Sequence, residues 1–139
     1  MKKLNVILVY NKKQDKILMC KREKEPYKGK FNLVGGKIEP NENELKAAYR
    51  ELEEETGITK QNITLSHLMT FQYPLTNVEL QVYTGKLNEE VKLIEEVNKL
   101  YWIDKNENFL DTDKFAGDGN IGHILLQTEI YKDKLFNEE

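Results

Sequence analysis

The stretch from Gly35 to Ile58 constrains this chain more than any other, because its residue order predicts a loop followed by a helix. Asn41 can cap the start of that helix, with Glu44 three residues later as in a capping box. Gly57 suits the left-handed residue that ends a helix. A buried face with i, i+3, i+4, i+7 spacing is formed by Leu45, Ala48, Tyr49 and Leu52. We therefore expect a helix over about residues 42–56.

Three glutamates of this helix form an acidic cluster. At about 100° per residue, Glu51, Glu54 and Glu55 fall within roughly 100° of one another, beside the buried face. Like charges at these spacings repel, and acids near a helix C-terminus oppose its dipole. One interpretation is a solvated acidic face, which is common in a chain with 32% charged residues. The other is a divalent-cation site, since Mg²⁺ prefers carboxylate oxygens.

The residues around the cluster favour the cation site. The stretch fits the pattern G-x5-E-x7-R-E-U-x-E-E-x-G-U at every defined position, where U is a bulky aliphatic residue. The matching residues are Gly36, Glu42, Arg50, Glu51, Leu52, Glu54, Glu55, Gly57 and Ile58. In this motif, over residues 36–58, the chain resembles the Nudix hydrolases, which cleave a diphosphate linked to another moiety.

The resemblance implies a site for Mg²⁺, or for Mn²⁺ in its place. The positions of the family's metal ligands are taken by the Gly35 carbonyl and by Glu51, Glu54 and Glu55. Arg50 would brace these acids through an ion pair, with Glu42 as a supporting carboxylate. Glu54 or Glu51 would hold the attacking water or accept its proton, and we favour Glu54. Family members often supply one more carboxylate from the loop before a strand tryptophan. Here Trp102 indicates Glu96, with Glu95 as the alternative.

Five further residues are candidates for substrate binding, four through the same resemblance and Lys37 from its position in the sequence. In related nucleotide hydrolases a basic residue at the place of Arg22 contacts the phosphates, although surface charge explains it nearly as well. Lys37, directly after the glycines, could reach a phosphate. Asn32 matches an asparagine that reads the base in hydrolases of oxidised purine nucleotides, or it is a strand-edge residue bonded to the backbone. Asp118 and Asn120 match residues that bind the purine edge in antimutator-type enzymes, or they cap a helix.

The rest of the chain predicts strands around this unit and a closing helix. Strands are expected over residues 4–10, 17–22, 31–34, 63–73, 78–87 and 100–103. A helix is expected over 121–131, followed by a frayed tail over 132–139. These signals alternate without a βαβαβ rhythm, so a doubly wound parallel sheet is not expected. Together with the resemblance, they indicate an α/β fold of the Nudix type. We expect an α/β/α sandwich with a mixed β-sheet in one domain over residues 1–139.

Composition excludes several classes of protein. The single cysteine, Cys20, excludes an intramolecular disulfide and fits a reducing cytoplasm; we expect it in a buried or half-buried strand. The net charge of −3 argues against a partner that is a nucleic-acid polymer. The N-terminal apolar run is too short for a signal peptide, and no stretch approaches the ~20 apolar residues of a membrane span. We therefore expect a cytoplasmic protein without membrane association.

The resemblance implies metal-dependent hydrolysis of a nucleoside triphosphate or another nucleoside diphosphate derivative, a small-molecule nucleotide. The favoured substrate is the oxidised purine 8-oxo-dGTP, cleaved to the monophosphate and pyrophosphate. ADP-ribose, a dinucleoside polyphosphate and an RNA 5′ end are alternatives within the family. A non-catalytic nucleotide sensor is a third hypothesis, which the presence of every motif acid disfavours. Many relatives dimerise, so a homodimer is also open, although no stretch of the sequence indicates an interface.

Overall fold

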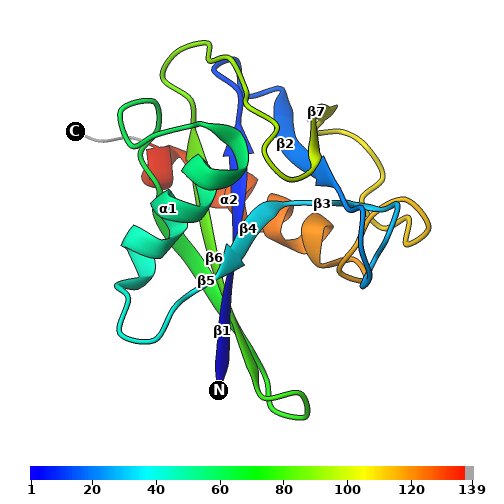
Figure 1. The fold of residues 1–139 in the computed structure, drawn as a ribbon. Helices are drawn as coiled ribbons and strands as arrows, with labels where there is room; N and C mark the ends of the chain where they lie inside the picture. The colour runs from blue at the N-terminus through cyan, green and yellow to red at the C-terminus, as the bar shows by residue number, and fades with distance from the viewer. Residues whose placement is uncertain (137–139) are drawn as a thin grey trace.

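The computed structural model describes residues 1–136, which form a mixed β-sheet with one helix against each face (Figure 1). The strands are β1 (Lys2–Tyr10), β2 (Lys16–Lys21), β3 (Phe31–Asn32), β4 (Val34–Lys37), β5 (Ser66–Tyr73), β6 (Val78–Lys86) and β7 (Lys99–Asp104). The helices are α1 (Glu44–Thr56) and α2 (Asn120–Phe136). The expected α/β/α sandwich is confirmed. Neither helix in this range combines the length and the apolar character needed to cross a membrane.

The sheet opens beside its central strand, β1. On one edge, β1 pairs in parallel with β6 along its whole length. On the other edge, residues 4–7 of β1 pair with β4, and β2 joins only at the Tyr10–Ile17 pair. Strand β2 therefore diverges from β1 and carries β3 and β7 with it. This wedge between β1 and β2 is where the cavity described below lies.

Side-chain alternation along β1 explains how both faces of the sheet are covered. Ile7 and Val9 belong to the core on the α1 side, whereas Leu8 and Tyr10 belong to the core on the α2 side. All four are fully buried. A strand buried on both faces must be apolar at successive positions, which is why this segment reads as a continuous hydrophobic run.

Helix α1 begins at Glu44, two residues later than predicted. Its N-cap is Asn43, whose Oδ1 accepts a hydrogen bond from the Lys46 N–H at 3.0 Å. Asn41 was the wrong choice because it has a left-handed backbone, with φ of 67°. The chain turns there, and the Glu42 N–H donates to the Glu39 carbonyl at 3.0 Å. Residue 42 therefore precedes the helix.

The buried face of α1 contains three of the four predicted residues, since Ala48 and Leu52 are buried and Tyr49 packs against the same core, but Leu45 was predicted wrongly. Leu45 is 40% exposed, whereas Ala47, Ala48 and Leu52 are fully buried. The two adjacent alanines are small, so they let the helix backbone approach the sheet closely, and Leu45 in the first turn points away from that contact. The predicted C-terminus is confirmed, since Gly57 is left-handed with φ of 80°.

Helix α2 is longer than predicted, and residues 132–136 continue it rather than forming a frayed tail. The Phe136 ring packs edge-on against Tyr10, with centroids 5.6 Å apart. The Tyr10 hydroxyl donates to Glu129 at 2.6 Å. These contacts with β1 hold the last turns of the helix in place. The rest of the predicted tail, residues 137–139, lies outside the described residues.

Strands β5 and β6 form a long antiparallel hairpin at the edge of the sheet. The strand predicted from residue 63 begins only at Ser66, because Ile63 makes a single bridge to Leu87. A bulge between His67 and Met69 shifts the register.

Candidate active site

The Gly35–Gly36 segment of β4 lies against both β1 and α1. A Cβ atom on Gly35 would collide with the Asn5 carbonyl oxygen, and one on Gly36 would collide with the Glu51 carboxylate. The Asn5 side chain fixes the segment further, since its Oδ1 accepts the Gly36 N–H at 2.9 Å. Glycine at position 36 therefore leaves the space that the Glu51 carboxylate occupies.

Arg50 connects the acids of α1 to the loop before it. Its Nε and Nη2 donate to the two oxygens of Glu42 at 2.6 and 2.9 Å. Its Nη1 donates to Glu51 at 3.0 Å and to Glu54 at 3.1 Å. Its Nη2 also donates to the Lys37 carbonyl at 3.0 Å. A planar guanidinium can make this set of contacts, whereas a lysine ammonium cannot.

Glu55 and Glu51 lie in surroundings that disfavour their charged forms. Burial, together with the charge of nearby Glu51, raises the pKa of Glu55 to about 7, although the Gly35 backbone and Arg22 oppose that rise. Burial also raises the pKa of Glu51, against the effect of Arg50. Glu54 differs from both, because its side chain is 57% exposed. The three acids thus sit close together with unequal access to water.

These acids suit a hard divalent cation by their chemistry. Carboxylate and carbonyl oxygens are what Mg²⁺ prefers, and the lack of a side chain at Gly36 lets the Glu51 carboxylate lie against β4. Among residues 1–136, however, no three Asp, Glu, His or Cys side chains converge as a preformed metal site. Arg50 pairs with Glu51 and Glu54 instead, which offsets the repulsion between them.

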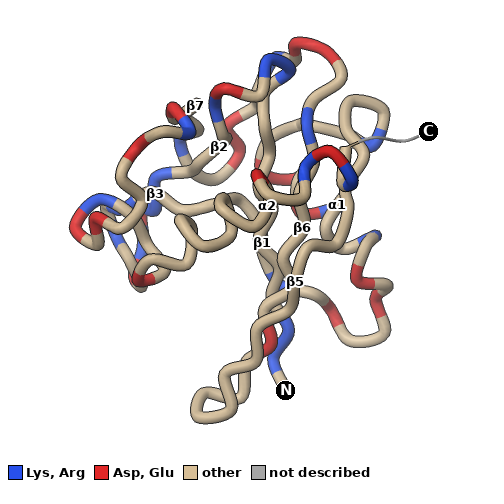
Figure 2. Tube along the Cα trace, turned by 180° about the vertical axis from the view of Figure 1, so that it is seen from behind, with Lys and Arg blue, Asp and Glu red and all other residues tan. Residues whose placement is uncertain are grey.

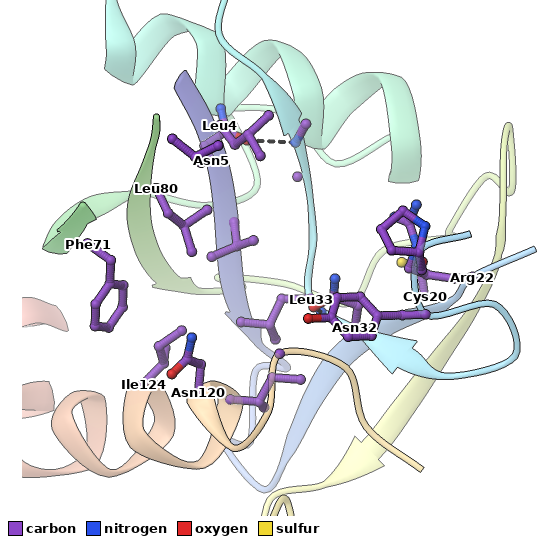
Figure 3. Close-up of a pocket in the computed structure, with 18 of the residues that line it drawn as sticks. Leu4, Asn5, Cys20, Arg22, Asn32, Leu33, Phe71, Leu80, Asn120 and Ile124 are labelled. Carbon is purple, nitrogen blue, oxygen red and sulfur yellow. Dashed lines mark hydrogen bonds between the residues drawn. The ribbon is translucent and has the colours of Figure 1, made fainter. Parts of the chain in front are cut away.

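A cavity of about 810 Å³ fills the wedge between β1 and β2. Figure 3 shows Arg22 and Cys20 on one side of it and Phe71, Asn120 and Ile124 on the opposite side. The side near α1 is lined by Arg22, Gly35, Gly36, Glu55 and Asn98. Arg22 is anchored there, because its Nε donates to the Pro26 carbonyl at 2.7 Å. This side of the cavity therefore combines the Arg22 guanidinium with the Glu55 carboxylate and the Gly35–Gly36 segment.

Polar side chains line the cavity on both sides: Asn32 lies beside its strand partner Cys20, and Asn120 lies on the facing side with Phe71 (Figure 3). The Asn32 Oδ1 accepts the Leu33 N–H at 2.8 Å, and the Asn120 Nδ2 donates to the Tyr73 hydroxyl at 2.9 Å. The Tyr27 hydroxyl lies 3.5 Å from Asp118. Asn32, Asp118 and Asn120, which are far apart in the sequence, are thus brought to one cavity.

Five predicted site residues do not line the cavity: Arg50, Glu51 and Glu54 of α1, and also Lys37 and Glu96. The Lys37 side chain is exposed, and only its carbonyl takes part in the site, through Arg50. Glu96 is exposed on the loop before β7, and it is Asn98 of the same loop that lines the cavity. The alternative, Glu95, accepts the Leu100 N–H at 2.7 Å. The roles of Lys37 and Glu96 stay predictions.

Cys20 lies where the sequence predicted it, in a strand and buried. Burial and the nearby Glu55 raise the pKa of its thiol to about 11. It therefore lines the cavity as a neutral, weakly polar group.

Four uncharged polar residues that line the cavity were not predicted from the sequence. They are Asn5, Tyr27, Tyr73 and Asn98. Tyr73 carried a weak signal, because it follows Phe71 at the two-residue spacing that puts both on one face of a strand. The other three have no local pattern that indicates a site.

Comparison with known proteins identifies the family. A family model for the NUDIX domain matches residues 1–123, and the chain belongs to the Nudix family. It is 48% identical over 46 residues to an ADP-ribose pyrophosphatase of Methanocaldococcus jannaschii, covering 33% of this chain and 27% of the relative. It is 32% identical over 82 residues to an 8-oxo-dGTP diphosphatase of Escherichia coli, covering 58% of this chain and 64% of the relative. The chain thus spans less than two thirds of the length of either relative.

A solved structure gives the same fold over nearly the whole chain. An Ap4A hydrolase of C. elegans superposes with a TM-score of 0.74, covering 94% of this chain and 98% of that one. The two sequences are only 20% identical, so this likeness concerns the fold alone.

Proposed function

We propose that this protein is a divalent-cation-dependent pyrophosphohydrolase that cleaves a nucleoside diphosphate derivative, with 8-oxo-dGTP as the favoured substrate. The observation that carries the proposal is the composition of one cavity. Glu55, the Gly35–Gly36 segment and Arg22 line it near α1, and Asn120 with Phe71 lines the facing side. A nucleotide has matching ends, a charged phosphate chain and a flat base.

The phosphate end supports a division of roles among the motif residues. Gly35, Glu51, Glu54 and Glu55 would hold Mg²⁺ or Mn²⁺. When bound, such an ion neutralises phosphate charge and lowers the pKa of a water molecule. Arg22 would contact the phosphates as a charge-assisted donor. Arg50 would keep Glu51 and Glu54 in place. Glu54, the most exposed of the three acids, is our candidate for accepting a proton from water.

The base end supports a nucleoside as the substrate. Asn32, Asp118 and Asn120 offer polar atoms at the cavity wall, and apolar side chains such as Phe71 and Ile124 provide surfaces against which a ring can lie. The Escherichia coli relative, named for 8-oxo-dGTP, supports the oxidised purine. The Methanocaldococcus jannaschii relative favours ADP-ribose as the second candidate.

Composition supports two further parts of the proposal. The single cysteine agrees with a cytoplasmic protein, and the net charge of −3 agrees with a free nucleotide rather than a nucleic-acid polymer as the ligand. The homodimer stays a prediction.

A substrate panel tests the proposal. The purified protein with MgCl₂ is assayed against 8-oxo-dGTP, dGTP, ADP-ribose and Ap4A, and kcat/KM is compared. We expect 8-oxo-dGTP to be the best substrate. A higher value for ADP-ribose would select the second candidate, and no turnover of any compound would overturn the proposed activity.

Substitutions on α1 test the roles of the acids. Glu54→Ala or Glu55→Ala should lower kcat at least roughly a hundredfold without loss of the folded state, judged by circular dichroism. Glu53→Ala is the matched control, because Glu53 is exposed on the same helix and outside the motif acids. Near-normal turnover in the first two variants would contradict the assignment.

A further inference from the structure

We infer that Asn5 is a positioning residue, whose side chain fixes the peptide group between Gly35 and Gly36 and with it the direction of the Gly35 carbonyl. The inference rests on the proposed function, because it assumes that this carbonyl is a ligand of the divalent cation. It gives a residue of β1, outside the family motif, a role in the affinity for that cation.

Asn5 interrupts an apolar strand. It is the one polar residue in the run over residues 4–9 of β1. It lies two residues before Ile7, so its side chain is on the α1 face of the sheet, and it is only 2% exposed. A buried polar side chain is costly unless its atoms are hydrogen-bonded. The presence of asparagine here therefore has to be explained by what its amide contacts.

The two polar atoms of this amide have different surroundings. The Oδ1 atom accepts the Gly36 N–H at 2.9 Å, a contact that Figure 3 shows beside α1. The Nδ2 atom is buried without a hydrogen-bond partner, and no other buried side-chain nitrogen or oxygen among residues 1–136 shares that condition. The two ends cannot be exchanged, because an amide nitrogen does not accept from an N–H. The side chain thus contributes its oxygen, although its nitrogen is left unpaired at a cost.

The Gly35–Gly36 segment depends on such a contact. A peptide group between two glycines rotates with little steric hindrance, because neither residue has a Cβ atom. Larger residues cannot stiffen the segment, since a Cβ on Gly35 would collide with the Asn5 carbonyl oxygen and one on Gly36 with the Glu51 carboxylate. The support has to come from β1, the strand with which β4 pairs.

The same hydrogen bond determines where the Gly35 carbonyl points. This carbonyl and the Gly36 N–H belong to one planar trans peptide group, so they point in opposite directions. Because the N–H points to the Asn5 amide, the carbonyl points away from it. Carbonyl oxygens are ligands of Mg²⁺, and a group that is already oriented loses less freedom on binding. Asn5 would thereby raise the affinity of the loop for the cation.

Gln81 provides a matched control for Asn5. It is the register partner of Asn5 on β6, it is 6% exposed, and it also reaches α1 through Glu44. Its side chain has other partners, since Oε1 accepts from Thr70 at 3.1 Å and Nε2 donates to Glu79 at 2.6 Å. It does not line the cavity. Gln81→Leu therefore removes a buried amide on the same face without removing the contact to Gly36.

Binding of Mn²⁺ to the purified protein without nucleotide tests the inference. Electron paramagnetic resonance of the free ion gives its Kd, and urea unfolding without metal checks that each variant is folded. We expect Asn5→Leu and Asn5→Ala to bind Mn²⁺ roughly tenfold more weakly than the wild type. Asn5→Asp keeps an oxygen for the Gly36 N–H, so it should bind at least as tightly as the wild type. Gln81→Leu should bind like the wild type.

A merely structural role for Asn5 gives the opposite order. Asn5→Leu, which suits an apolar strand, would then keep wild-type affinity, and Asn5→Asp, which buries a carboxylate, would be the impaired variant. Wild-type affinity in Asn5→Leu, or an equal loss in Gln81→Leu, would overturn the inference. Failure of the proposed function is distinct: a wild type that binds no Mn²⁺ would overturn both, whereas Mn²⁺ binding without turnover in the substrate panel would overturn the activity alone.

Discussion

At the scale of single residues, Arg50 organises the acidic cluster of α1. One guanidinium contacts Glu42, Glu51 and Glu54 and the Lys37 carbonyl. The pairing offsets the repulsion that three neighbouring glutamates would otherwise cause. It also links α1 to the segment that precedes it. Glu42 is the partner that is bound most completely, because both of its oxygens accept from Arg50.

The Glu42–Arg50 pair predicts a pH-dependent contribution to stability. Hydrogen bonds from Arg50, and then from the Glu39 backbone, lower the pKa of Glu42 from 4.5 to about 2. Since the folded-state pKa lies below the ordinary value, the pair stabilises the fold above pH 4.5 and this stabilisation is lost as pH falls toward about 2. Glu42→Gln should therefore be less stable than the wild type at neutral pH, with a difference that shrinks in acid.

Urea unfolding across this pH range measures that difference. Glu39→Gln is the control, because Glu39 is exposed and its contacts here involve only its backbone. A stability difference between Glu42→Gln and the wild type that grows as pH falls would contradict the assigned pKa direction.

At the scale of elements, a glycine is required by packing in β4, whereas a glycine in α2 only lowers the stability of the helix. Gly36 lies beside the Glu51 carboxylate, where a methyl group has no room. Gly122 lies within helix α2, and a Cβ there would meet Phe109 at an ordinary 3.7 Å. A glycine inside a helix costs stability relative to alanine because its backbone is more flexible when unfolded.

The same substitution at both glycines should therefore give opposite results. Gly122→Ala should stabilise the protein by roughly 0.5–1 kcal/mol in urea unfolding, with unchanged kcat/KM. Gly36→Ala should displace Glu51 and lower kcat/KM by at least roughly tenfold. Retained activity in Gly36→Ala would show that Glu51 can move without consequence, and loss of stability in Gly122→Ala would contradict the packing at α2.

At the scale of the whole molecule, the far end of α2 is tied to the central strand away from the cavity. The buried Tyr10 hydroxyl donates to Glu129, which also accepts from Lys105 at 3.0 Å. Burial alone would raise the pKa of Glu129, but hydrogen bonds from Tyr10 and Lys105 lower it. Helix α2 thus has a cavity residue, Asn120, at its start and an anchor to β1 in its later turns.

This arrangement predicts that stability and activity can be separated. Tyr10→Phe removes one hydrogen bond to a charged acceptor, so it should destabilise the protein by about 1–2 kcal/mol in urea unfolding. Its kcat/KM should stay close to the wild-type value, because Tyr10 does not line the cavity. A large loss of activity at wild-type stability would show that the anchor also controls the site.

The sequence by itself determined the parts of this protein that depend on local spacing. The acids of α1, the brace Arg50 and the end of the helix at Gly57 are set within a few turns of one segment, so their relation follows from helix geometry. Buried strands such as β1 could also be predicted from local sequence, because a strand that is buried on both faces is a continuous run of apolar residues.

Only the tertiary structure decided which distant residues meet. The exposure of Leu45 depends on how α1 approaches the sheet, and the last turns of α2 depend on Tyr10. The pairing of Tyr73 with Asn120, and the approach of Asn98 rather than Glu96 to the cavity, follow from the divergence of β2 from β1 and from the course of the loops. Such contacts join segments that no local spacing relates, so they exist only once the sheet has assembled.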